Sequence, residues 1–314
     1  MIDRHKYAFN GVCYFENARE HMETNDFRRI PIGRVGGIDG WLLTMVRKTV
    51  DLRPTFKPFI YNLESKPILI LCYYSSIVKN DGSLACPAEN SLYLPSAHGA
   101  GGQNGITPDM WLDEENGYLT NGGITIEYGF QIEAILSPEN IWTFNFHDPL
   151  FDCQEKRNMI SFCKENDEMP LFHCHKQLLT FHSTYFNSDS NENQKVELSD
   201  ENLTHFNHFL QFSHGVSGFK ATESLFQILK YSQKYKLSNV TQLAEQSIRI
   251  NTFNFGIHIS MANFFGLSHC LADLLREYES AKGLALDIRL LKRDQLEELS
   301  GETMKKCVKR FLEL

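Results

Sequence analysis

Residues 172–188 read FHCHKQLLTFHSTYFNS, and this stretch decides the fold of the central part of the chain. It joins a short strand-like segment, residues 171–174, to a helical one. A second short helix is expected around residues 183–186. Strands threaded through short helices indicate a mixed α/β domain.

The flanking residues supply the other elements of this domain. Residues 158–164 and 171–174 predict a hairpin, with the polar run 165–169 as its turn, and Val196-Glu-Leu198 predicts a third strand after a polar linker at 188–194. Two helices should follow, the first capped by Ser199 or Asp200 and the second by Thr222. The residues expected to face inward are Leu203, Phe206 and Leu210 in the first helix and Leu225, Ile228 and Leu229 in the second.

The order of these signals resembles the core signature of BTB/POZ domains, in which a strand delivers H-x-H-K, a helix follows, and H-S-x-Y-F starts the next. Here these residues are His173-Cys-His-Lys176 and His182-Ser-Thr-Tyr-Phe186. The resemblance covers roughly 100 residues, which we place at 145–250. It implies a protein-interaction module without chemistry of its own.

Residues 1–140 are rich in β-formers and turn signals, and they predict an antiparallel β-sandwich. The run 124–135 alternates apolar and polar side chains, and the apolar run 68–74 suits a strand buried on both faces. The tryptophan-led strand at Trp41 and the stretch 116–127, NGYLTNGGITIE, resemble a MATH (TRAF-like) domain. A generic β-sandwich remains the alternative for this region.

Residues 251–314 predict a helical extension, similar to the 3-box or BACK-type region that follows many BTB domains. Leu271, Leu274, Leu275 and Tyr278 have helical spacing behind a Ser268 cap, with Gly283 as the stop. Met304, Cys307, Val308 and Phe311 repeat that spacing. Tyr235-Lys-Leu-Ser238 and Phe265-Gly-Leu-Ser268, thirty residues apart, suggest a repeated helix pair. The whole chain is therefore expected to be a multidomain α+β protein.

Composition narrows the possible partners and the compartment. The chain has 314 residues and a net charge of −8, which argues against bulk binding to nucleic acid or to an anionic membrane. Its N-terminus lacks the apolar core of a signal peptide, and its longest apolar run is too short for a membrane helix. Eight scattered cysteines are then expected to be free thiols. We expect a soluble protein of the cytoplasm, the nucleus or both.

Signals for catalysis, cofactors or metals are weak. The glycines at 33–40 and 98–105 match no phosphate-binding motif, and no serine or cysteine has the context of a nucleophile. Zinc would need ligands from Cys163, His173, Cys174, His175 and His182, but adjacent strand positions alternate faces and cannot all converge. We therefore expect no enzyme activity, no cofactor and no metal.

The candidate site residues come from the BTB resemblance and from an excess of aromatic side chains. By resemblance, residues 151–159 would form a homodimer, and the face near Tyr185 and the following helix would bind a cullin. Some of the aromatic residues should line a protein interface, because aromatic anchors dominate affinity there. The candidates are Phe151, Asn158 and Met159 for the dimer, Tyr185, Phe186 and Phe209 for the cullin, and Phe212 as a further interface residue.

Two differences from the usual BTB sequence weaken this assignment of site residues. BTB domains usually have an aspartate where this chain has Asn158, and an apolar pair where residues 187–190 read Asn-Ser-Asp-Ser. The sequence hypothesis is an adaptor resembling the MATH-BTB proteins of nematodes: a substrate-recognition subunit of a cullin-RING ubiquitin ligase, with the N-terminal domain holding an unknown target. The alternatives are a BTB oligomerisation scaffold or transcriptional co-regulator without a cullin role, and an enzyme in the N-terminal half.

Overall fold

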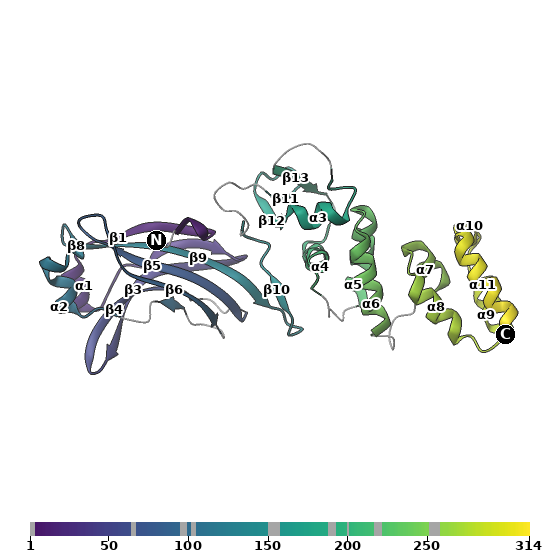
Figure 1. Cartoon of the computed structure of the whole chain (residues 1–314), viewed down its shortest axis with the longest axis horizontal. Coiled ribbons are helices and arrows are strands. Elements are labelled where there is room, and N and C mark those ends of the chain that lie inside the picture. The colour runs from purple at the N-terminus through teal and green to yellow at the C-terminus, as the bar shows by residue number, and fades with distance from the viewer. Residues whose placement is uncertain are drawn as a thin grey trace. The chain divides into compact units, whose positions relative to one another are not determined.

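The computed structural model describes residues 4–63, 67–94, 99–101, 105–149, 158–187, 193–199, 201–216, 222–250 and 258–314. The chain forms two compact units. The first contains Met1–His175 and Asn191–Leu198, and the second contains Lys176–Ser190 and Ser199–Leu314. The layout of antiparallel sheets, a mixed α/β segment and C-terminal helices confirms the predicted multidomain α+β class (Figure 1).

The N-terminal part of the first unit is a two-sheet sandwich. One sheet has the order β1-β9-β5-β6, with β8 and β10 also paired to β9, and the other has the order β2-β3-β4-β7. All pairings in both sheets are antiparallel. The strands are β1 (Phe9–Phe15), β2 (Ile30–Val35), β3 (Ile38–Val50), β4 (Arg53–Asn62), β5 (Leu69–Val78), β6 (Leu84–Leu94), β7 (Ala100–Gly101), β8 (Leu119–Thr120), β9 (Gly123–Leu136) and β10 (Trp142–Phe144). Short helices are η1 (Arg4–Lys6), α1 (Ala18–Thr24), α2 (Pro108–Leu112) and η2 (Glu114–Asn116).

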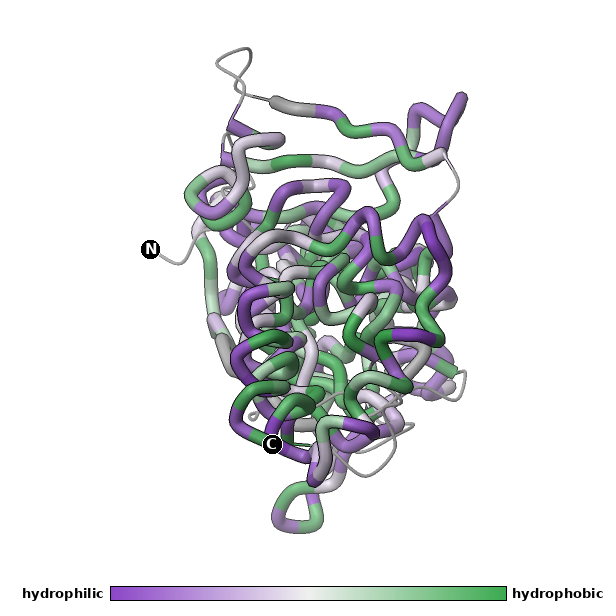
Figure 2. Tube along the Cα trace, turned by 90° about the vertical axis from the view of Figure 1, so that its right-hand side faces the viewer, coloured by the Kyte–Doolittle hydropathy of each residue, from purple (hydrophilic) through white to green (hydrophobic). Residues whose placement is uncertain are grey.

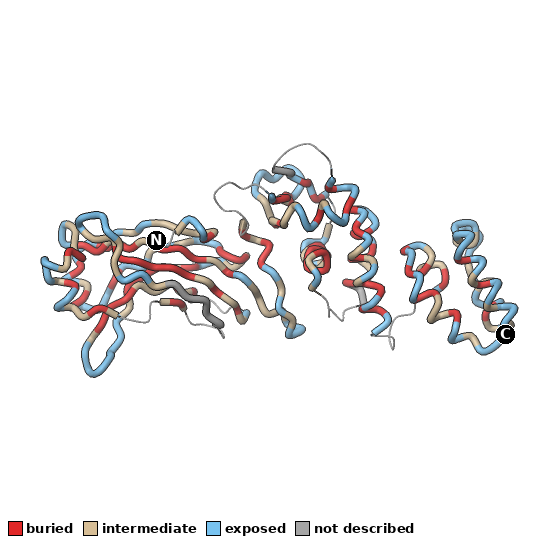
Figure 3. Tube along the Cα trace, in the orientation of Figure 1, coloured by how far each residue is buried: buried red, intermediate tan, exposed pale blue. Residues whose placement is uncertain are grey.

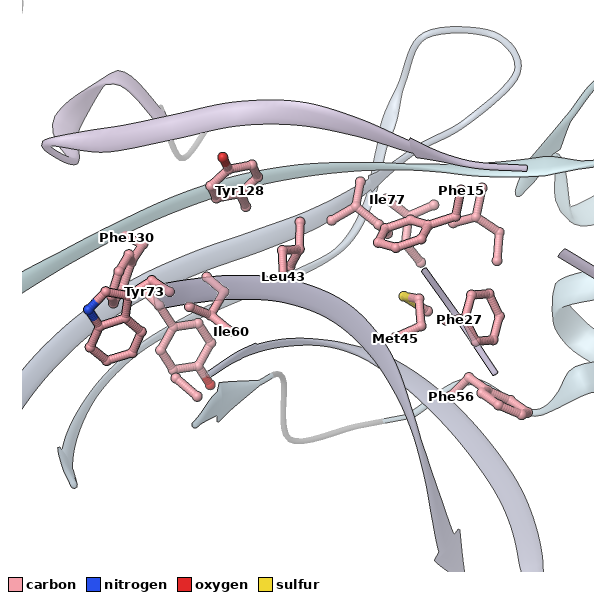
Figure 4. Close-up of a cluster of buried hydrophobic side chains, with 14 of the residues drawn as sticks. Phe15, Phe27, Leu43, Met45, Phe56, Ile60, Tyr73, Ile77, Tyr128 and Phe130 are labelled. Carbon is pink, nitrogen blue, oxygen red and sulfur yellow. The ribbon is translucent and has the colours of Figure 1, made fainter. Parts of the chain in front are cut away.

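The sandwich core lies between the two sheets, where apolar side chains from both interlock (Figure 4). The predicted alternation in β9 is confirmed, because Ile124, Ile126, Tyr128, Phe130 and Ile132 are all buried. The Trp41 ring lies 4.8 Å from that of Phe130, so the two sheets meet through aromatic rings. Burying each such side chain contributes about 1.5–3 kcal/mol, and the row as a whole fixes the register of β9.

The β3–β4 hairpin extends past this core. Its ladder is continuous from Trp41 opposite Asn62 to Val50 opposite Arg53. The two turn residues, Asp51 (φ 49°) and Leu52 (φ 65°), have left-handed backbone conformations. A leucine in that conformation costs roughly 1–2 kcal/mol, because its Cβ approaches the following carbonyl oxygen. Figure 3 shows the end of this hairpin as exposed.

A buried polar hub follows β10, at residues 145–148. Asp148 accepts hydrogen bonds from the Gly36 backbone N–H (2.8 Å) and from Asn145 Nδ2 (2.7 Å). The His147 ring packs on Phe172, with 5.2 Å between ring centroids, and its Nδ1 lies 3.2 Å from the Leu171 carbonyl oxygen. Residues 145–148 are therefore held in place by contacts with Gly36, Leu171 and Phe172.

The first unit also contains a small mixed sheet of three strands, β11 (Met159–Lys164), β12 (Pro170–His175) and β13 (Asn193–Leu198). The order is β12-β11-β13, with β12 antiparallel and β13 parallel to the central strand β11. This confirms the predicted hairpin and third strand. The third strand begins at Asn193, so it includes the end of the segment predicted as a polar linker.

The second unit is helical. Its helices are α3 (Lys176–His182), α4 (Leu203–Ser213), α5 (Thr222–Lys234), α6 (Ser238–Ile250), α7 (Ile259–Phe265), α8 (Ser268–Glu277), α9 (Ala281–Leu290), α10 (Arg293–Glu297) and α11 (Gly301–Glu313). Leu225, Ile228 and Leu229 of α5 are fully buried, as predicted. The cap predicted for α4 was wrong: Asn202 caps it, accepting from the N–H groups of Thr204 and His205.

The predicted repeat of helix pairs is confirmed by the two connecting turns. Lys236 and Gly266 both have left-handed backbones, at φ 51° and 69°. The Leu237 N–H donates to the Ser232 carbonyl (2.8 Å), and the Leu267 N–H donates to the Ala262 carbonyl (2.8 Å). These matching bonds are the 6→1 bond of a Schellman turn. The pairs α5–α6 and α7–α8 thus share one turn geometry, thirty residues apart.

One other prediction for the C-terminal helices was wrong. Gly283 does not stop α8, because α8 ends at Glu277 and Gly283 lies in the first turn of α9, where its N–H donates to Ser280 Oγ. The helical spacing predicted for Met304, Cys307, Val308 and Phe311 is confirmed by α11, and of these four residues only Cys307 is buried. Met304, Val308 and Phe311 are exposed, so the apolar side of this helix is wider than its buried face. Figure 2 shows hydrophobic and hydrophilic positions alternating along these helices.

Candidate protein-interaction site

Ser183 organises the turn that follows α3. Its hydroxyl donates to the Tyr235 carbonyl oxygen (2.5 Å) and accepts from the N–H groups of Tyr185 (3.0 Å) and Phe186 (3.3 Å). Ser183 itself is buried. One side chain therefore satisfies three backbone groups that the short turn would otherwise leave without partners.

An aromatic cluster around Tyr235 fills the space behind this turn. Its ring stacks on Phe186 at 5.4 Å between centroids and meets Phe209 at 5.5 Å. The Tyr235 hydroxyl donates to Glu201 Oε1 (2.7 Å), which also accepts from Lys234. Burial raises the pKa of Tyr235 strongly, and the Glu201 carboxylate raises it further. Burial also opposes ionisation of Glu201, but the bonds from Lys234 and Tyr235 outweigh it and lower the pKa of that carboxyl.

This packing corrects three of the candidate interface residues. Phe186, Phe209 and Phe212 are completely buried, so they offer no area to a partner in this structure. Aromatic content alone could not separate core from interface, because the domain uses these rings to fill its own interior. Tyr185 is different, since 43% of it is exposed while its ring edge contacts Phe186 and Tyr235. Tyr185 remains a predicted partner contact.

The candidates for the dimer segment lie in the first unit. Asn158 has a left-handed backbone (φ 60°) immediately before β11, and Met159 is buried in that strand, paired with His175 and Asn193. Met159 is therefore a core residue of the small sheet. Phe151 lies outside the described residues.

The structure adds an exposed apolar pair of side chains that the sequence interpretation missed. On α3, Phe181 is 82% exposed and Leu178 is 45% exposed, while Leu179 is fully buried. Leu178 and Phe181 are three residues apart, so they occupy one side of the helix, which we call the α3 apolar face. The sequence KQLLTFH contained a signal for this face. Leu179 alone fills the inward side of the short helix, so Leu178 and Phe181 have no core position to occupy.

A second feature of this unit is a groove beside α6 and α8. Glu245 of α6 is buried, and its carboxylate accepts from the N–H groups of His269 (2.6 Å) and Cys270 (2.9 Å) at the start of α8. This replaces the predicted Ser268 cap, since α8 has no side-chain cap of its own. The groove, of about 820 Å³, is lined by polar residues that include Gln242, Glu245, Arg249 and His269.

The cluster considered for zinc does not converge. Cys174 is fully buried, whereas His173 and His175 on either side of it are half-buried. His173 Nδ1 lies 3.2 Å from Ser161 Oγ, and burial raises the pKa of the Cys174 thiol well above its usual value. Among the residues that the structure describes, no group of three or more His, Cys, Asp or Glu side chains could hold a metal ion.

A mixed three-stranded sheet, helices built around an aromatic core and an exposed apolar helix face are features that a protein-interaction domain can have. Comparison with protein families makes this specific: residues 165–252 match the BTB/POZ domain, a protein-interaction module. The search of curated proteins gave no match. Within the described part of the chain, no helix is long and apolar enough to cross a membrane.

Proposed function

We propose that this protein is an adaptor that forms a homodimer through its BTB domain and serves as a substrate-recognition subunit of a cullin-RING ubiquitin ligase, in the cytoplasm or nucleus. The observation that carries the proposal is the α3 apolar face within the BTB match. An exposed phenylalanine beside an exposed leucine favours burial against another protein. In a dimer with two-fold symmetry, the same two residues of the second copy would pack against this face.

The N-terminal sandwich is proposed as a MATH-like target-binding domain. Its two antiparallel sheets and its Trp41-led strand β3 are compatible with that family. Dimerisation would present two such domains at once, which raises the effective concentration of a target near the ligase.

The dimer is tested by light scattering on the full chain with Phe181→Glu and, as the matched control, Gln246→Glu at an exposed position of α6. A buried charge at position 181 should weaken association at least about tenfold, because each copy would desolvate a carboxylate. A wild-type protein that stays monomeric at high micromolar concentration would contradict the dimer.

The cullin role is tested separately, by binding of a purified cullin N-terminal domain to the full chain. Tyr185→Ala should weaken binding about tenfold or more, as expected for a partly exposed aromatic anchor. Thr184→Ala, an exposed neighbour, is the control. Absence of binding by a folded dimer would rule out the ligase role and favour the second candidate, an oligomerisation scaffold or transcriptional co-regulator. The polar run Asn-Ser-Asp-Ser at 187–190 is the observation that supports this second candidate.

A further inference from the structure

The end of the β3–β4 hairpin, residues 47–53, is an exposed and ordered projection. Every one of these residues is exposed, whereas Met45 and Thr55 on the two strands behind them are buried. The cross-strand pairing nevertheless continues to the last pair, Val50 with Arg53. The hairpin end (Figure 1) is therefore held in shape by its own ladder, while its side chains are exposed.

Folding of the hairpin does not require a leucine at position 52. It is 96% exposed, and its left-handed backbone (φ 65°) is a conformation that glycine or asparagine adopts more readily. Two-residue hairpin turns of this kind favour Asn-Gly or Asp-Gly, and here the second position carries a large apolar side chain instead. Backbone strain of this sort at an exposed position is a reason to look for function. Val50, 48% exposed, adds further apolar area beside it.

Positive charge surrounds these apolar residues. Arg47, Lys48 and Arg53 lie within the exposed segment, against Asp51 as its one acid, in a chain whose net charge is −8. Arg47 and Arg53 form no ion pair with any other residue that the structure describes. Burial lowers the pKa of Lys57 on β4, and the charge of Lys48 lowers it further, so cations are crowded along this hairpin.

We propose that residues 47–53 are an interaction surface for an acidic protein, with Leu52 inserted into an apolar pocket of the partner and Arg47, Lys48 and Arg53 paired with its carboxylates. Arginine is enriched in interface hot spots, an exposed apolar side chain favours burial against a partner, and the positive charge is complementary to an acidic surface. Asp51 favours a protein over a lipid bilayer. It adjoins Leu52, so inserting the turn into hydrocarbon would carry a carboxylate with it. This inference rests on the proposed target-binding role of the sandwich and names the surface that performs it.

The test uses the full chain, immobilised, and a phage library that displays random peptides. Peptides that combine acidic with apolar residues should be enriched on the wild type. Leu52→Gly should lower their recovery at least about tenfold, equivalent to 1.4 kcal/mol. The same substitution should leave the melting temperature unchanged or raise it, because glycine suits the turn. Leu63→Gly removes another exposed leucine, at the far end of the same hairpin, and serves as the matched control.

A second variant, Arg47→Glu with Arg53→Glu, should also lose the enriched peptides, and added salt should weaken binding to the wild type. Equal recovery on the wild type and on Leu52→Gly, or no enrichment of acidic apolar peptides, would overturn the proposal. So would binding to phosphatidylserine vesicles, but not to phosphatidylcholine vesicles, that Leu52→Gly abolishes, since it would assign the surface to a membrane. Dimerisation and cullin binding should survive all these substitutions, so failure of the adaptor role and failure of this surface give different results.

Discussion

Single residues in this protein stabilise contacts between segments that are far apart in the sequence. Ser183 ties the turn after α3 to the end of α5, fifty-two residues later in the chain, through the Tyr235 carbonyl. His147 and Asp148 belong to the buried hub after β10, where burial lowers the pKa of the histidine and raises the pKa of the acid. Ser183 and His147 each give a prediction that a substitution can check.

Ser183→Ala should destabilise the protein by about 1–3 kcal/mol, because the buried N–H groups of Tyr185 and Phe186 lose their acceptor. Chemical denaturation followed by tyrosine fluorescence measures this change. Thr184→Ala, one residue along and exposed, should have little effect. Similar losses for both variants would show that the hydroxyl network is not what stabilises the turn.

The stability of the folded protein should depend on pH because of His147 in the buried hub. Its folded-state pKa lies below the ordinary value of 6.5, mainly through burial and with a contribution from Arg34, while the bond to Leu171 opposes the shift. The unfolded chain therefore binds the proton first, and stability should fall as the pH drops from 6.5 through the folded-state pKa. In His147→Gln the melting temperature, measured over a series of pH values, should fall less steeply as the pH drops. Asp148 is common to both proteins, and the exposed His182→Gln is the control. Parallel slopes would disprove the assignment.

At the scale of elements, helix ends are where neighbouring helices are joined. The N-terminus of α8 is capped by Glu245 from α6, and Arg249 of α6 is paired with Asp273 of α8 (2.6 Å). The carboxylate also lies at the positive end of the helix dipole. A buried side chain of α6 thus caps α8, at a position where sequence spacing suggested a local serine cap.

Glu245→Ala should destabilise the helical unit by about 1–2 kcal/mol, since two N–H groups of α8 would lose their acceptor. Glu245→Gln keeps a carbonyl oxygen and should lose less. Gln246→Ala, on the exposed side of the same helix, is the control. Hydrogen exchange of the His269 and Cys270 amides gives a local measurement, and unchanged protection in Glu245→Ala would contradict the capping role.

Elements that depend on local pattern were predictable, and contacts across the chain were not. The alternation in β9, the hairpin of β11 and β12, and the repeated turn at Lys236 and Gly266 all leave a short-range signature in the sequence. The caps of α4 and α8 and the burial of Phe186 depend on residues that meet only after folding. Of the aromatic candidate site residues in the described structure, Tyr185 alone keeps substantial exposed area, because an aromatic side chain serves core and surface equally well in sequence terms.

At the scale of the whole molecule, the proposed dimer links stability to concentration. Association that involves only the folded state raises the melting temperature as protein concentration rises. The wild type should show this dependence in scanning calorimetry, and Phe181→Glu should lose it while melting as a monomer. A melting temperature that is independent of concentration in both proteins would exclude self-association through the α3 apolar face.

The order of the small sheet determines where the chain can be cut. The BTB match begins at residue 165, one residue after β11 ends, yet β11 is the central strand that joins β12 to β13. A fragment trimmed to the match would keep two strands that do not pair with each other and would expose the edges of both. Unpaired edges of that kind promote aggregation. A recombinant fragment intended to fold should therefore start before Met159, and the hub at residues 145–148 gives a reason to start earlier still.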